Sequence, residues 1–316
     1  MRTLWSRARR GFQSPMLGTF TAITTLALVG CGGSSGNGSG EDTDLRAFVF
    51  GPDTAEEAAF LVADTIDVFL EVSEITNAVI ELGESDKTSA NLSGELCGGD
   101  GVAELTVPPL EDGVDALLQF SNCGEDALSG TVYFRVQSYT DAATPGPFFI
   151  SLVDLDLNQE EKGLTVETRA EFAVEAFRDT QSVRFRYFGD QSESYWFLTE
   201  GGQATKIGCF DLSIRKIDDS VWLDGIRGVF VSQAKRVFSI PPFRDALLFE
   251  EGIVVGGNGF DFFSQGKCGV VGAPEGITPG TTNMKLTTDP EVTAGIVLSF
   301  PGGTINTTWS QILDDQ

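Results

Sequence analysis

The hydrophobic period of this chain changes once, and that change limits the folds open to it. Between residues 54 and 82 apolar side chains recur every three or four positions, which is the period of an α-helix. From about residue 100 onward they recur at every second position, the period of a strand buried on one face. We therefore expect one helix followed by a long run of strands.

The helical stretch, DTAEEAAFLVADTIDVFLEVSEITNAVIELG, carries a wide apolar stripe. Asp53 or Thr54 can cap its start, and Gly83 is placed to end it. A membrane-surface helix is normally basic, whereas this one has no Lys or Arg between Arg46 and Lys87. We therefore expect the chain's own sheet to cover the stripe. Its members are Leu61, Val62, Thr65, Ile66, Val68, Phe69, Val72, Ile75, Val79 and Leu82.

The strand pattern is clearest in GLTVETRAEFAVEAF, residues 163–177, and in QSVRFRYFG, residues 181–189. Turn-forming segments such as GGDG, TEGGQ and VGGNG separate the strands, and a spacing near ten residues predicts a meandering sheet. The predicted fold class is α+β, mostly β, with a long N-terminal helix packed on a large curved antiparallel sheet, in one domain over residues 45–316. Further strands are predicted at 102–107, 114–121, 130–138, 147–157, 194–199, 207–217, 226–232, 250–256, 259–264, 283–288 and 293–300.

Residues 1–30 have the parts of a secretory signal peptide. Four arginines open the chain without any acid, and an apolar stretch follows from Met16 to Gly30. A stretch of 15 residues is shorter than the ~20 that a membrane-spanning helix needs. The alternative is a buried N-terminal helix, which would have to keep the four arginines solvated at its start.

Leu28-Val29-Gly30-Cys31 resembles the lipobox of bacterial lipoproteins. The resemblance implies cleavage between Gly30 and Cys31, followed by acylation of the Cys31 thiol and of the new amino terminus. Two or more acyl chains anchor a protein stably. In such families an Asp after the cysteine can retain the protein at the inner membrane. Here Gly32 follows, so the resemblance implies the outer membrane, with the protein facing the periplasm.

The segment after the cysteine, GGSSGNGSGEDTD, has no apolar side chain and cannot join a core. We therefore expect residues 31–44 to be the lipidated cysteine and a flexible tether. A Gly/Ser-rich chain of this length has an end-to-end distance of roughly 20 Å. Such a tether would let a folded domain stand away from the lipid surface.

The charge and the missing histidine exclude several functions. Removing residues 1–30 takes four of the 21 basic residues and none of the 46 acidic ones, so the remaining 286 residues carry a net charge of −29. Such a chain repels nucleic acid, and its acidity favours solubility. The chain has no His, which excludes Ser-His-Asp and Cys-His catalysis and histidine metal sites.

Four cysteines remain after Cys31, and an even number in an exported chain predicts disulfides. Three pairings are open, and we favour Cys97–Cys123 with Cys209–Cys268 because sequential pairing needs no crossing. A four-thiolate zinc site is the alternative, although no C-x-x-C spacing supports it. The pattern LCGGDG…FSNCGEDALSGTVYF is similar to a motif of uncharacterised β-rich bacterial lipoproteins, in which paired cysteines flank a β-hairpin.

Few segments offer candidate chemistry. Asp154, Asp156 and Asn158 stand at alternate positions in DLDLNQEE and could present oxygen ligands to Ca²⁺, although a solvated strand face is the plainer interpretation. Residues 178–244 hold ten basic and eight acidic side chains, a relatively cationic strip in an acidic chain. It predicts either cross-strand ion pairs or a docking face for an acidic partner or lipid head groups.

These observations predict an envelope lipoprotein that is anchored at Cys31 and has no catalytic residues and no cofactor. Its folded part would be a structural or interaction module, with an envelope protein or lipid as partner. The alternative is a carrier of lipid or another hydrophobic ligand, with a cavity between the helix and the curved sheet. A carboxylate-based hydrolase is a third hypothesis, but acids are so abundant that no one pair stands out.

Overall fold

The computed structural model describes residues 46–124, 128–140, 146–161, 164–187, 196–200, 203–217, 220–232, 236–240, 247–249, 259–264, 283–289, 291–292 and 295–314. The predicted signal peptide, Cys31 and the tether lie outside the described residues, as do Cys268 and the strand predicted at 250–256.

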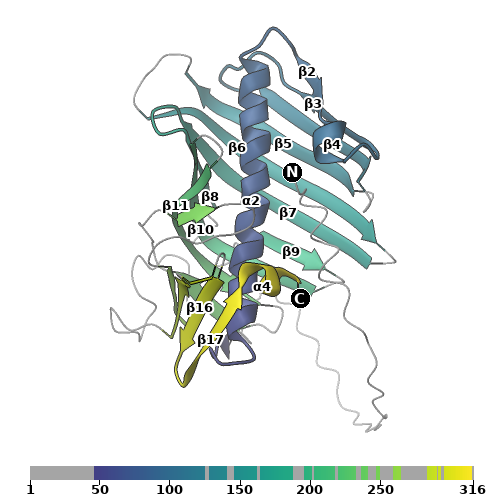
Figure 1. Ribbon diagram of the computed structural model, residues 1–316. Coiled ribbons are helices and arrows are strands. Elements are labelled where there is room, and N and C mark those ends of the chain that lie inside the picture. Colours follow the sequence, from purple (N-terminus) through teal and green to yellow (C-terminus); the bar gives the residue numbers. More distant parts are fainter. Residues whose placement is uncertain are drawn as a thin grey trace, which may run out of the picture.

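The predicted helix is α2, Ala55–Gly83, which lies across one face of a large sheet (Figure 1). The apolar stripe is buried except for the half-buried Leu61, while Glu74 and Glu81 on the opposite side are exposed. Two threonines inside the helix are also buried. The hydroxyls of Thr65 and Thr76 each donate to the carbonyl four residues earlier at 2.7 Å, so neither leaves a polar group without a partner.

The two ends of α2 differ from the expected capping. Thr54 is the N-cap residue, but its hydroxyl donates to the Val49 carbonyl at 2.6 Å and makes no bond to the first turn. Gly83 is the last helical residue, yet it does not adopt the left-handed conformation of a C-terminal glycine cap. Its role is close packing, because a Cβ at this position would lie 2.4 Å from Leu110 Cγ.

In the described part of the chain the large sheet has thirteen strands, and eleven of them follow one continuous path. From β2 to β8 the neighbours in space are neighbours in sequence and antiparallel, as a meander requires. The sheet bends around α2, so that β10 and β11 are seen nearly edge-on beside the helix in Figure 1. Its strands are β1 (Arg46–Ala47), β2 (Ser89–Asn91), β3 (Val102–Thr106), β4 (Asp115–Cys123), β5 (Leu128–Tyr139), β6 (Pro147–Glu161), β7 (Leu164–Phe177), β8 (Ser182–Arg186), β9 (Trp196–Glu200), β10 (Gln203–Ile217), β11 (Ser220–Val231), β12 (Arg236–Ile240) and β13 (Leu247–Phe249).

Two details depart from a simple meander. Short strands β8 and β9 lie end to end between the longer β7 and β10, each pairing with part of both. The short β1 pairs with β12 in parallel, so the sheet is not wholly antiparallel as predicted. The first described residues of the chain are therefore held at one edge of the large sheet.

The C-terminal strands form a second sheet, whereas the sequence pattern predicted a single sheet. It contains β14 (Phe260–Phe262), β15 (Met284–Thr288), β16 (Gly295–Phe300) and β17 (Gly303–Thr308), in that order. The short helix α4, Trp309–Asp314, follows β17 and packs against α2 (Figure 1). One further short helix, α3 (Ser93–Leu96), precedes β3.

Phenylalanine side chains join these layers into one core. Phe69 of α2 meets Phe172, Phe185 and Phe210 of the large sheet, with ring centroids 5.0, 5.0 and 4.7 Å away. A second group of phenylalanines links the two sheets, because the ring centroids of Phe238 in β12 and Phe262 in β14 are 5.9 Å apart. Buried residues of α2, of both sheets and of α4 belong to the same apolar cluster.

Candidate functional site on the polar face of the large sheet

The predicted oxygen ligands lie on β6, on the face of the large sheet away from α2. Asp154 and Asp156 are exposed and alternate with the buried Val153 and Leu155, while the side chain of Asn158 is outside the described part. Asp154 stands opposite Glu171 of β7, so two carboxylates face each other across adjacent strands. The described residues contain no group of three or more Asp, Glu or Cys side chains placed to hold a metal ion.

Four arginines of the cationic strip lie on the same polar face and pair with acids, namely Arg184, Arg186, Arg215 and Arg227. Arg184 of β8 donates from Nε and Nη2 to the two carboxylate oxygens of Asp211 at 2.7 and 2.6 Å. Arg227 of β11 contacts the same carboxylate at 3.3 Å. Asp211 is only 12% exposed, and its hydrogen bond raises the pKa of Arg184 above the ordinary value. One carboxylate thus joins three neighbouring strands.

Two more pairs extend this network along the sheet. Arg215 of β10 makes a two-pronged contact with Asp224 of β11, with Nε–Oδ2 and Nη2–Oδ1 distances of 2.9 Å, and its guanidinium lies 5.9 Å from the ring centroid of Trp222. Arg186 of β8 pairs with Glu175 of β7. These four arginines are occupied by acids of their own sheet, as the cross-strand interpretation expects. The docking face stays a prediction for the rest of the strip.

A separate polar cluster ties the C-terminal end of α2 to the sheet. The Tyr139 hydroxyl at the end of β5 donates to Glu84 Oε1 at 2.5 Å, and Arg178 from the β7–β8 turn pairs with the same carboxylate. The Arg178 guanidinium also lies 4.0 Å from the centre of the Phe148 ring. Burial and then the Glu84 carboxylate raise the pKa of Tyr139 above its usual 10.0. Sequence reasoning missed this cluster, because its members are 55 and 94 residues apart.

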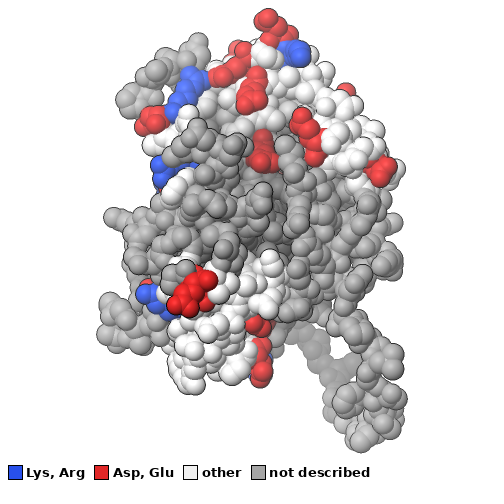
Figure 2. Space-filling view, in the orientation of Figure 1, with Lys and Arg blue, Asp and Glu red and all other residues white. Residues whose placement is uncertain are grey.

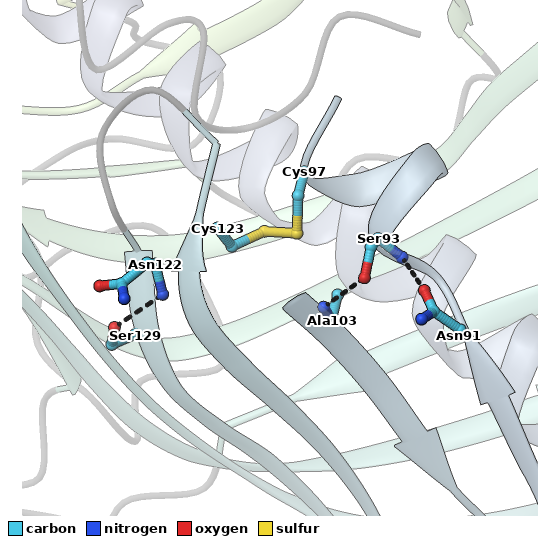
Figure 3. The surroundings of a disulfide bond; sticks show 7 residues. All are labelled: Asn91, Ser93, Cys97, Ala103, Asn122, Cys123 and Ser129. Atoms are coloured by element: carbon cyan, nitrogen blue, oxygen red, sulfur yellow. Dashed lines mark hydrogen bonds between the residues drawn. A yellow bond between two sulfur atoms is a disulfide. The ribbon is translucent and has the colours of Figure 1, made fainter. Parts of the chain in front are cut away.

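Cys97 and Cys123 form a disulfide, which is the first predicted pairing (Figure 3). Cys97 follows α3 and Cys123 ends β4, so the bond closes the ends of the β3–β4 hairpin. Ser93 Oγ accepts from the Ala103 amide at 2.9 Å, which fixes α3 on the same hairpin (Figure 3). Gly101 is needed there, since it has a φ of +84° and a Cβ would lie 1.9 Å from the Asn122 carbonyl oxygen.

Cys209 is also disulfide-bonded. It lies in an irregular part of β10, where the register shifts between Gly208 and Asp211, and its φ is +51°. It packs against three buried valines, Val229, Val231 and Val237, that form a small cluster apart from the main core. Its predicted partner, Cys268, lies outside the described residues, so this pairing stays a prediction.

Within the described ranges, no helix is both long enough and apolar enough to span a membrane. Comparisons with known proteins found no matching protein family, no similar characterised protein and no similar solved structure.

Proposed function

We propose that this protein is a bacterial lipoprotein, cleaved before Cys31 and anchored by acyl chains on that residue to the outer membrane, where it faces the periplasm. The sequence Leu28-Val29-Gly30-Cys31 carries the proposal, because it joins a short apolar segment to a cysteine with small residues before it. The Gly/Ser-rich stretch that follows supports it. Fourteen residues lie between Cys31 and Arg46, where β1 joins the large sheet, which leaves room for a tether.

The folded part acts as a structural or interaction module without catalytic chemistry. The absence of His in the sequence and the pairing of Glu175, Asp211 and Asp224 with arginines support this assignment, because a carboxylate bound in an ion pair is a poor general acid. A carrier of hydrophobic ligands is the second candidate. Where Phe69 faces the sheet, its ring meets three others at centroid distances of 5.0 Å or less, which is the packing of a filled core.

The proposal is tested in cells that express the complete chain and receive a labelled fatty acid. We expect label in the wild-type protein and none in Cys31→Ser, with the wild type in the outer-membrane fraction. Gly32→Asp is the control for the membrane, since it keeps acylation and should move the protein to the inner membrane. Label that persists in Cys31→Ser would contradict the anchor at Cys31.

A further inference from the structure

Among the described residues the second sheet ends at β17, an edge strand that lacks the usual protection. Edge strands are commonly blocked by charged side chains, proline or bulges, because an open edge recruits other strands. Residues 295–308, which form the β16–β17 hairpin, carry no charged side chain, and the register between the two strands has no shift. The surface at the lower left of Figure 2, where this hairpin lies, is mostly white below a red and a blue group at its upper edge.

The register shows which backbone groups of β17 point away from β16. In an antiparallel pair, residues alternate between bonding the partner strand and pointing outward. The Thr308 amide donates at 3.0 Å to Gln311 Oε1 of α4, so Thr308 points outward. By the same alternation the backbone amides and carbonyls of Asn306 and Thr304 point away from β16, and both residues are exposed. No hydrogen bond in the described part of the chain uses their outward amides or carbonyls.

We propose that β17 pairs with β17 of a second copy of this chain, antiparallel and about a two-fold axis at Ile305. This register places Thr304 opposite Asn306 of the partner, and Asn306 opposite Thr304. The four outward groups of each strand then form four main-chain hydrogen bonds, and the two second sheets become one continuous sheet. Gln311 occupies the Thr308 amide, which confines the pairing to this self-complementary segment.

The uncharged hairpin permits self-pairing, and the net charge of the whole chain gives the interface a salt signature. The paired strands would bring no like charges face to face, since neither carries any. The two chains nevertheless repel at longer range, because each is strongly acidic. Salt screens charges separated by more than about 10 Å at 0.1 M, whereas it leaves main-chain hydrogen bonds in place. The dimer should therefore become more abundant as salt is added.

The test is native mass spectrometry of the full chain, expressed from its complete sequence and released from mild detergent over a range of protein concentrations. Thr304→Pro removes two of the four bonds and should weaken the dimer roughly thirtyfold. Ser89→Pro is the matched control. It lies on β2, the last strand of the large sheet among the described residues. Its backbone groups point outward, because Thr88 bonds to Val107 and Leu92 to Ala103, which fixes the alternation between them. The control should leave the dimer unchanged.

Thr304→Lys tests the same edge without proline and should also give monomers. A wild-type chain that stays monomeric at every concentration and salt would overturn the proposal, as would a dimer that survives both Thr304 variants. A dimer lost equally in Ser89→Pro would place the contact elsewhere and overturn it too. The same spectra show whether acyl mass is present, so failure of the dimer and failure of the lipid anchor are separate results.

Discussion

Replacing Phe69 by Ala tests whether the space between α2 and the large sheet is a filled core. Phe69 is 1% exposed, and its ring contacts the rings of Phe172, Phe185 and Phe210. Truncating a buried Phe costs about 3–5 kcal/mol, and the loss of three aromatic contacts places this site near the upper end of that range. That is a large part of the ~5–15 kcal/mol that usually separates folded from unfolded chains.

The assay is urea unfolding, monitored by tryptophan fluorescence. The protein is the mature chain with Cys31→Ser, which prevents acylation. Phe60→Ala is the matched control, because Phe60 lies on the same helix but is only partly buried. It should lower the free energy of unfolding by about 1–2 kcal/mol. If Phe69→Ala costs about 1 kcal/mol or less, or no more than Phe60→Ala, Phe69 does not fill a core. A ligand cavity beneath the helix would then explain the result better.

Three other changes probe the polar face, the helix end and the hairpin. Asp211→Asn removes the carboxylate shared by two arginines and should cost about 2 kcal/mol in urea unfolding, whereas Asp224→Asn, with one arginine, should cost about half as much; equal losses would refute the shared role. Tyr139→Phe should cost about 1 kcal/mol at pH 7. Folding raises the pKa of Tyr139, so above about pH 10 the unfolded chain releases the phenol proton before the folded chain does. The wild type should therefore lose stability as the pH rises through this range. Urea unfolding at several pH values should show a smaller loss in Tyr139→Phe. Replacing Cys97 and Cys123 together by Ala should cost about 3 kcal/mol, because the bond closes a separation of 26 residues; an unchanged thermal midpoint would contradict this estimate.

Local periodicity was enough to predict the main elements. The apolar repeat placed the helix at 54–82, one residue from the observed Ala55–Gly83, because α2 is covered along most of its length. Alternation located β7 and β8 for the same reason, since Phe172, Val174, Val183 and Phe185 face one buried side. The Cys97–Cys123 pair followed from sequential order. Each of these features depends on residues that are close in the chain.

Features that depend on the polar edge of a sheet or on long-range register were missed. β17 shows no apolar alternation, because half of its residues are exposed at an edge. β2 is too short to show a period. The ten-to-eight excess of bases over acids between residues 178 and 244 did not show that Arg184 and Arg227 share Asp211. That contact exists only because β8 and β11 both flank β10. Composition shows how many charges a segment holds, whereas strand order decides which of them meet.

The intact mass of the protein purified from cell membranes is the decisive measurement for the lipid anchor at Cys31. We expect a chain that begins at Cys31 and carries a diacylglyceryl group and one further acyl chain. Its mass should also be lower by four hydrogens than that of the fully reduced chain, two for the Cys97–Cys123 bond and two for the predicted Cys209–Cys268 bond. A chain that still begins at Met1, or an unmodified Cys31 at the mature terminus, would contradict the lipoprotein assignment.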